Sequence, residues 1–135
     1  MDPLFSVSGR VIHGSHLGRK LGYPTANIAL SDETAYYPLR GVYFTQVHLN
    51  ERVYYGMANI GFRPSLENPA FTVEVNILDF EENIYNEILT VQFLQRLRDE
   101  KKFHSLEDLI AQMKEDEKTV RRLSLGFQNS NPNTL

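Results

Sequence analysis

The chain has 135 residues, enough for one domain with a buried core, and its 41% hydrophobic and 23% charged residues are ordinary for a soluble globular protein. A formal net charge of −3 argues against a general nucleic-acid or anionic-membrane binder, and the absence of cysteine excludes disulfides, thiolate metal sites and a cysteine nucleophile. No apolar run is long enough to span a bilayer and no signal-peptide core follows Met1, so we expect a cytoplasmic protein.

The first two-thirds of the sequence predicts short β-strands. Most of these segments alternate apolar and polar side chains, as half-buried strands do, or are rich in β-branched and aromatic residues. Asn50-Glu51 predicts the turn of a hairpin between the second and third strands. Regular spacing of short strands favours a sandwich or a closed barrel over a parallel βαβ sheet. The five expected strands are residues 5–12, 41–49, 52–60, 71–78 and 87–94.

The last third of the sequence changes to a helical period. Ser105 is the expected N-cap, and Glu107 and Asp108 place acidic side chains in the first turn, where the helix dipole favours them. We expect the helix to end at Gly126, so that a domain of residues 1–125 is followed by a polar tail of residues 126–135. The apolar stripe that predicts packing against the β-structure consists of Leu106, Leu109, Ile110, Met113, Val120 and Leu123.

A glycine-rich segment with two cationic residues follows the first strand. Its backbone N–H groups could approach phosphate oxygens closely, and Arg19 and Lys20 would add positive charge there. The segment lacks G-x-x-x-x-G-K-[ST], and no helical pattern follows it as a dinucleotide fingerprint requires. On glycine spacing alone, a turn-rich loop is the better interpretation. The glycines are Gly9, Gly14, Gly18 and Gly22.

Three side chains further along suggest metal and proton chemistry. Thr25 and Asn27 are two positions apart, so on an extended segment their oxygens share a face, and hard oxygen ligands of this kind suit Mg²⁺. The alternative is an ordinary turn in which Asn27 hydrogen-bonds local backbone. Glu74 shares a polar strand face with Thr72 and Asn76 and could accept a proton from an attacking hydroxyl. For an isolated strand glutamate, plain solvent exposure is the better alternative.

Seven motifs occur in order along most of the chain, from about Phe5 to Leu123. They are Gly9-Arg10-Val11, Gly18-Arg19-Lys20-Leu21-Gly22, Pro24-Thr25-Ala26-Asn27, Gly41-Val42-Tyr43, Asn59-Ile60-Gly61 with Arg63-Pro64, Glu74-Val75 with Asp79-Phe80, and Leu97-Arg98-Asp99-Glu100 with Phe103. Together they resemble the riboflavin kinase family, in particular the kinase module of bacterial bifunctional FAD synthetases. In those proteins the module normally follows an FMN adenylyltransferase module, for which this chain has no room, so such a module is an expected partner absent from the chain.

The resemblance implies a six-stranded antiparallel closed barrel with a C-terminal helix packed on it. It implies transfer of the γ-phosphate of ATP to the ribityl 5′-hydroxyl of riboflavin, giving FMN and ADP, with Glu74 as the catalytic base and Mg²⁺ on Thr25 and Asn27. The expected ATP and phosphate residues are Gly14, Gly18, Arg19, Lys20, Gly22, Pro24, Thr25, Ile77, Asp79 and Tyr85. The expected flavin residues are Leu97, Arg98, Lys101, Phe103 and Leu106.

The chain departs from the family pattern in two places, both near the adenine end of the expected nucleotide site. The family commonly carries D-x-Y-G where this chain has Asn83-Ile84-Tyr85-Asn86, and often has histidine at the position of Asn76. Two other functions are alternatives: a non-catalytic flavin- or nucleotide-binding barrel, and an oligonucleotide-binding barrel. A pure binder has no use for metal ligands beside a base, and the acidic charge argues against the second.

Overall fold

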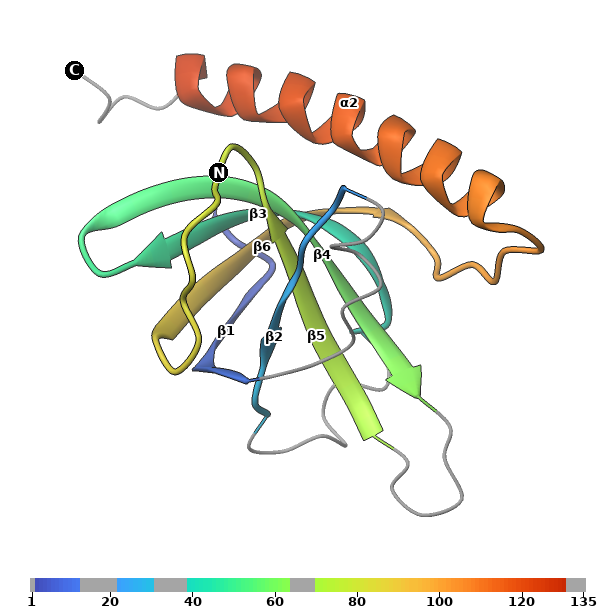
Figure 1. Cartoon of the computed structure of the whole chain (residues 1–135). Helices are drawn as coiled ribbons and strands as arrows, with labels where there is room; N and C mark the ends of the chain where they lie inside the picture. The colour runs from blue at the N-terminus through green and yellow to red at the C-terminus, as the bar shows by residue number, and fades with distance from the viewer. Residues whose placement is uncertain (1, 13–21, 31–38, 64–69, 131–135) are drawn as a thin grey trace.

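The computed structural model describes residues 2–12, 22–30, 39–63 and 70–130, which form six strands and a long C-terminal helix (Figure 1). The elements are β1 (Phe5–Ile12), β2 (Ala26–Ile28), β3 (Gly41–Leu49), β4 (Arg52–Arg63), β5 (Ala70–Ile77), β6 (Ile88–Arg98) and α2 (Leu106–Ser130). The first strand and the β3–β4 hairpin lie where the sequence predicts them. Asn50 in the hairpin turn has φ 56°, a left-handed conformation that asparagine tolerates well.

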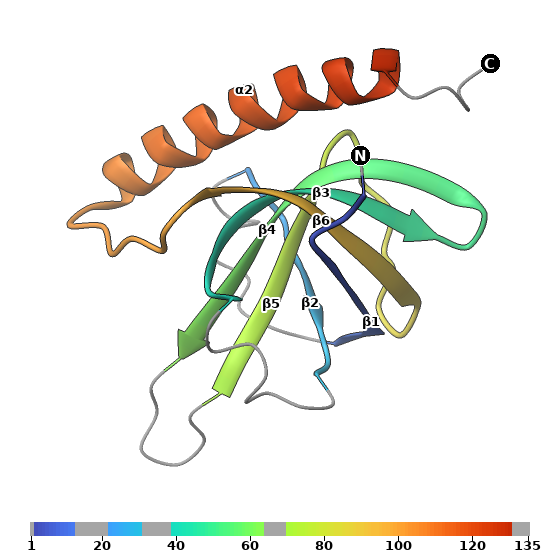
Figure 2. The ribbon, with the colours of Figure 1, turned by 180° about the vertical axis from the view of Figure 1, so that it is seen from behind.

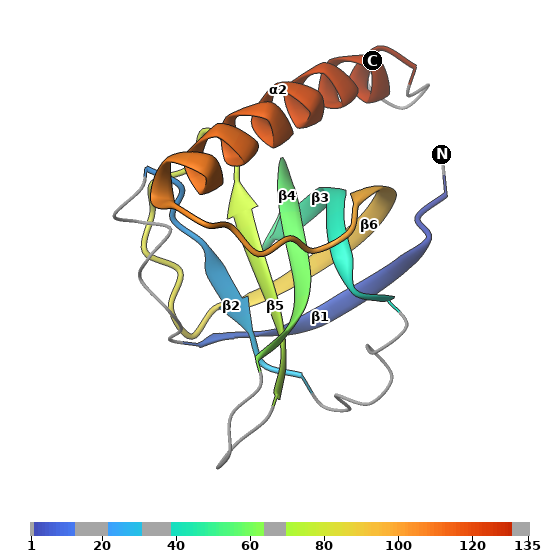
Figure 3. The ribbon, with the colours of Figure 1, turned by 90° about the vertical axis from the view of Figure 1, so that its right-hand side faces the viewer.

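The strands close into an antiparallel barrel in the order β1-β2-β5-β4-β3-β6 (Figure 3). Closure depends on β1, which pairs with the short β2 at one end and along most of its length with β6. The expected six-stranded antiparallel barrel with a C-terminal helix is therefore confirmed. Among the described residues, no helix, α2 included, has an apolar stretch long enough to cross a membrane.

Apolar side chains fill the barrel interior because alternate residues of each strand point inward. Val73 and Val75 of β5 are almost completely buried there. At one end of the interior, the ring of Phe5 stacks on Phe93 with centroids 4.5 Å apart, and Tyr43 meets both rings edge-on. The polar side chains between these inward positions are left on the outer face of the barrel.

Helix α2 lies along the outside of the barrel, as Figures 1 and 2 show from opposite sides. Its Val120 is fully buried in a second apolar cluster against the outward-facing Phe44, Met57 and Leu94. The helix begins as predicted, because the backbone N–H of Asp108 donates to Ser105 Oγ at 3.1 Å, which is an N-cap hydrogen bond.

The predicted helix end at Gly126 is wrong, because α2 continues to Ser130. A helical glycine costs about 1 kcal/mol relative to alanine. The next residue offsets that cost: the ring of Phe127 meets those of Phe44 and Tyr55 edge-on, at 6.3 and 5.9 Å between centroids. Packing of Phe127 against the barrel therefore stabilises the helix beyond Gly126, the residue at which the sequence predicts its end.

Candidate functional site

Glu74 lies at the centre of a polar row that crosses three strands on the outer face of the barrel. In the β-ladders its register partner on β2 is Asn27, and its partner on β4 is Asn59. Side chains directly opposite each other in antiparallel strands share a face and lie close together. Since Val73 and Val75 point into the barrel, the row faces outward, as the strand alternation predicts.

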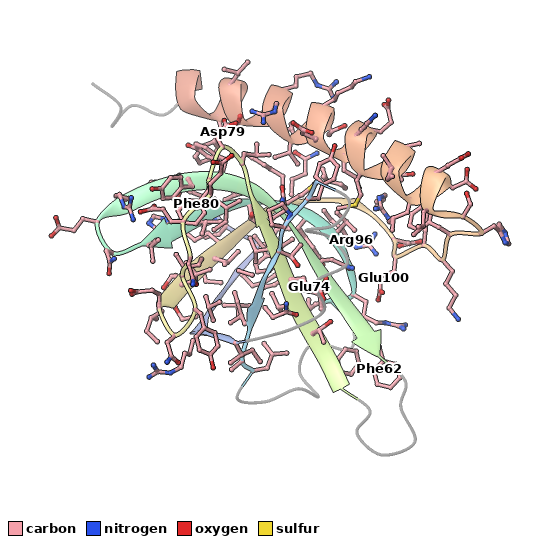
Figure 4. The ribbon with its side chains drawn as sticks, viewed as in Figure 1. Phe62, Glu74, Asp79, Phe80, Arg96 and Glu100 are labelled. Carbon is pink, nitrogen blue, oxygen red and sulfur yellow. The ribbon has the colours of Figure 1, made fainter. Side chains whose placement is uncertain are left out.

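A cavity of about 270 Å³ lies between this face of the barrel and the beginning of α2. Its barrel side is largely polar, with Thr25, Asn59 and Glu74, whereas the helix side presents Leu109 and Met113. Figure 4 marks Glu74 on β5 and Glu100 on the connection between β6 and α2. The remaining lining residues are Val42, Met57, Ala58, Asn76, Arg98, Lys101, Phe103 and Asp116. The cavity thus joins a carboxylate, hydroxyl and amide groups to an apolar wall.

An ion pair fastens the helix side of the cavity to the barrel. The guanidinium of Arg98, the last residue of β6, donates to the Asp116 carboxylate through Nε and Nη2, at 3.0 and 2.7 Å. Asp116 is only 6% exposed, and Gln112 Nε2 also donates to it at 3.0 Å. A buried charge left without its partner costs several kcal/mol, so this pair holds α2 and β6 together at the cavity.

The side chain of Glu100, on the connection between β6 and α2, lies against Gly61 of β4. A Cβ at Gly61 would lie 2.8 Å from Glu100 Oε2, inside van der Waals contact. The glycine of the Asn59-Ile60-Gly61 motif therefore leaves room for the exposed Glu100 side chain, which lines the cavity.

Asn59 lines the cavity, although the sequence predicts no role for its side chain. Its Oδ1 is buried and has no hydrogen-bond partner in the part of the chain that the structure describes. Buried polar atoms are rarely left unpaired, and those that are often lie at functional sites. What marks Asn59 as a site residue is its position directly opposite Glu74 in the β4–β5 ladder. The amino-acid pattern alone does not reveal this pairing.

The predicted nucleotide residues lie in several places. Thr25 lines the cavity, and the carbonyl of the adjacent Pro24 accepts a hydrogen bond from Asn76 Nδ2 at 2.8 Å. Ile77 points into the barrel core, whereas Asp79 and Tyr85 are exposed and do not line the cavity. Gly22 is exposed, with φ 88°. Gly14, Gly18, Arg19 and Lys20 lie outside the described residues.

The predicted flavin residues divide into two groups. Arg98, Lys101 and Phe103 line the cavity, so the structure brings them to the same place as Glu74. Leu97 packs against the apolar cluster under α2, and Leu106 is 56% exposed at the start of the helix. Neither of these two leucines lines the cavity.

A charged network lies beside the cavity, on the next turns of α2. Hydrogen bonds from Arg121 lower the pKa of Asp79 and of Glu117, and these carboxylates in turn raise the pKa of Arg121. Burial, followed by its hydrogen bond to Glu117, raises the pKa of Tyr23 to about 12. Tyr23 therefore keeps its proton, and the network keeps its charges, throughout the physiological pH range.

Two side-chain oxygens near Glu74, those of Thr25 and Asn27, are of the kind that could hold a metal ion. Thr25 lines the cavity, whereas Asn27, two residues later, is only 6% exposed and does not line it. The described residues contain no group of three or more histidine, cysteine or acidic side chains that could hold a metal by themselves. A site with few protein oxygens fits Mg²⁺, which keeps waters and takes phosphate oxygens as further ligands.

A closed barrel with a part-polar, part-apolar cavity under its C-terminal helix has the form of a small-molecule site, with the carboxylate of Glu74 on its polar side. The comparison with protein families identifies it further. The model of the family described as riboflavin kinase matches residues 2–124, and the chain belongs to that family.

Curated proteins similar to this chain are longer and are described as bifunctional. The bifunctional riboflavin kinase/FMN adenylyltransferase of Haemophilus influenzae is 40% identical over 118 residues, which cover 87% of this chain and 38% of that protein. The protein of the same description from Bacillus subtilis is 35% identical over 126 residues, covering 90% of this chain and 39% of that protein. The chain therefore spans less than two-fifths of the length of these relatives.

Solved structures share the fold. Riboflavin kinase from Trypanosoma brucei matches with a TM-score of 0.66 at 29% identity, over 91% of this chain and 80% of that one. A Streptococcus pneumoniae structure described as a macrolide-efflux protein matches with a TM-score of 0.76 at 38% identity, over 88% of this chain and 38% of that one.

Proposed function

We propose that this chain is a riboflavin kinase, which transfers the γ-phosphate of ATP to the ribityl 5′-hydroxyl of riboflavin and releases FMN and ADP. One observation carries the proposal: in a member of the riboflavin kinase family, Glu74 lines a cavity together with Thr25, Asn59 and an apolar wall, and its register partner on β2 is Asn27. A proton acceptor, oxygen ligands for a metal and an apolar surface are the groups that this reaction needs.

The two sides of the cavity support an assignment of the flavin. The ring system is flat and largely apolar, and it suits the wall formed by Phe103, Leu109 and Met113. The ribityl chain carries hydroxyl groups, which suit the polar side with Asn59 and Glu74. Bound in this direction, riboflavin would present its 5′-hydroxyl to the polar row.

Phosphoryl transfer needs in-line positioning and neutralisation of the phosphate charge more than covalent help from the protein. Thr25 and Asn27 would hold Mg²⁺, which would neutralise charge on the phosphates of ATP. Gly14, Gly18 and Gly22, with the cationic side chains of Arg19 and Lys20, are the residues that we propose for the phosphates themselves.

Glu74 would orient the 5′-hydroxyl and accept its proton as the oxygen attacks the γ-phosphorus. The β5 strand fixes the direction of this side chain, since its neighbours on both sides are anchored in the barrel core. General-base assistance of this kind typically contributes about 10²- to 10⁴-fold to the rate.

We further propose that these 135 residues convert riboflavin no further than FMN. We also propose that the protein acts in the cytoplasm, where ATP is available. The adenylyltransferase named in the bifunctional relatives belongs to proteins of which this chain matches less than two-fifths. In a longer protein, an adenylyltransferase module would use the FMN that this domain makes.

The test is to incubate the pure protein with riboflavin, ATP and Mg²⁺, and to separate the flavins and nucleotides by chromatography. We expect FMN and ADP in equal amounts, and no FMN when ATP is omitted. Riboflavin that binds but stays unphosphorylated would establish the non-catalytic barrel instead. Accumulation of FAD would contradict the proposed end product.

A further inference from the structure

Tyr23, which directly precedes the Pro24–Asn27 segment, is held by the C-terminal helix. Its hydroxyl donates to Glu117 Oε1 of α2 at 2.9 Å. Its ring packs against the apolar cluster between helix and barrel, the cluster that contains Leu78 and Val120. The side chain of Tyr23 is therefore fixed at both its ring and its hydroxyl.

The carboxylate that receives this hydrogen bond is itself held in place. Arg121 Nε donates to Glu117 Oε2 at 2.8 Å, so the two oxygens of Glu117 have different partners. The other nitrogens of Arg121 donate to the two oxygens of Asp79, at 3.1 and 3.0 Å, in the turn after β5. A chain of hydrogen bonds thus runs from the end of β5 through α2 to Tyr23.

A second, independent contact holds the next residue of the segment. Asn76 Nδ2 donates to the carbonyl oxygen of Pro24 at 2.8 Å. Asn76 is 7% exposed, and it stands on β5 two residues after Glu74, on the same outer face. The backbone just before Thr25 is therefore anchored from the helix by Tyr23 and from the sheet by Asn76.

We propose that Tyr23 and Asn76 are positioning residues for the metal–nucleotide complex, and that α2 sets the affinity for this complex through Glu117. The proposal rests on the proposed function, because it assumes that Thr25 and Asn27 face the metal. Mg²⁺ demands near-ideal geometry, so small displacements of two oxygen ligands weaken its binding. Residues that orient metal ligands without touching the metal commonly change affinity by about 10- to 100-fold.

Helix α2 thereby contributes to the site in two separate places, the first task being to line the cavity and the second to hold Tyr23. Near its beginning, Leu109 and Met113 line the cavity, and further along, Glu117 reaches the segment that carries Thr25. Loss of the Tyr23 hydroxyl should disturb the second task and leave the first intact. Metal–nucleotide binding and flavin binding should then respond differently to the same substitution.

The experiment uses Tyr23→Phe, which removes one oxygen and keeps the ring. Binding of Mn²⁺ in the presence of ADP is measured by electron paramagnetic resonance, and binding of riboflavin by quenching of its fluorescence. We expect Mn²⁺–ADP affinity to fall about tenfold, the lower end of the range for residues that orient metal ligands, with riboflavin affinity within about twofold of the unmodified protein. The matched control is Tyr55→Phe, which removes a half-buried hydroxyl bonded to Gln46 outside the cavity lining.

Variants of the partners make the inference sharper. Glu117→Ala should reproduce the loss seen in Tyr23→Phe, whereas Glu117→Gln keeps an acceptor for the hydroxyl and should lose less. Asn76→Ala should weaken Mn²⁺–ADP binding by removing the bond to Pro24. Melting temperatures of all variants identify any that are unfolded.

The outcomes separate the two proposals. If the unmodified protein binds Mn²⁺–ADP and makes FMN but Tyr23→Phe binds Mn²⁺–ADP equally well, the positioning role is wrong and the kinase assignment stands. If Tyr23→Phe weakens flavin and metal binding alike, the residue has only a structural role and the inference is overturned. If the unmodified protein neither binds Mn²⁺–ADP nor makes FMN, the proposed function itself is wrong.

Discussion

Glu74 and Asn27 face each other directly across the β2–β5 ladder, where β2 is only three residues long. The strand brings the proposed metal segment alongside the proposed base and fixes its register at residues 26–28. Backbone hydrogen bonds therefore place the proposed base and the proposed metal segment on the same face of neighbouring strands.

Replacement of Glu74 by glutamine should separate catalysis from binding. Glutamine keeps the size and hydrogen-bonding shape of the side chain but cannot take a proton. We expect kcat to fall by about 10²-fold or more, with riboflavin and ATP binding nearly unchanged, since the lost interaction is made in the transition state. Glu51→Gln, in the exposed β3–β4 turn, is the matched control. Near-normal kcat in a stably folded Glu74→Gln protein would rule out the base.

Removal of the metal should abolish the reaction. We expect no FMN in the presence of EDTA and full recovery when excess Mg²⁺ is added back. Asn27→Ala should raise the Mg²⁺ concentration needed for half-maximal rate and lower the rate itself, because one oxygen ligand is lost. Initial rates over a series of Mg²⁺ concentrations measure both effects. Undiminished turnover in EDTA is the result that contradicts the metal site.

Substitution of Thr45 by valine should stabilise the protein. Thr45 is fully buried in the barrel, and its Oγ1 has no hydrogen-bond partner in the described parts of the chain. Valine has the same shape without the unpaired hydroxyl, so we expect a gain of about 1 kcal/mol and a melting temperature higher by about 3–5 °C. Thr90→Val is the control, since the Thr90 hydroxyl is hydrogen-bonded to Ser8 and its loss should bring no gain. A lower melting temperature for Thr45→Val would contradict the unpaired hydroxyl.

The ion pairs of Arg121 should make stability depend on pH in the acid range. Arg121 holds the pKa values of Asp79 and Glu117 below their ordinary values. Such carboxylates add stability above their unfolded pKa, about 4, and lose it as the pH falls through the lower folded value. Arg121→Met should therefore lower the melting temperature more at pH 7 than at pH 3, by a modest amount because these groups are partly exposed. Arg122→Met, on the same helix, should show no such difference.

The regular strands could be predicted from the sequence because their side chains carry the signal. β1 and the β3–β4 hairpin have alternating or β-branched residues bounded by clear turns, and the structure confirms them. β2 has only three residues, too few to show a strand period, so its sequence predicts no more than an extended segment. β6 is longer than the predicted strand and continues to Arg98, because its pairing with β3 continues past two register shifts. The charged residues at this end of β6 break the apolar pattern, so the sequence does not predict the extension.

The site divides in the same way between local and long-range information. Thr25 and Glu74 carry chemical signals in their own segments, and the structure brings both to the cavity. Asn59 and Asp116 carry none, because their roles arise from pairing with residues 15 and 18 positions away, Glu74 and Arg98. Such partners become visible only when the register of the barrel and the path of the helix are known.

The pairing of β1 with β6 has a consequence for how the protein is made. Phe5 and Phe93, partners in that ladder, are separated by most of the domain, so the barrel can close only late in folding. During synthesis β1 leaves the ribosome before the other strands. Its edge that pairs with β6 stays unpaired until residues 88–98 have left the exit tunnel. An open edge is where strands of different molecules associate. The nascent chain is therefore most exposed to aggregation before its last strand appears, and the long separation of β1 and β6 in the sequence extends this period.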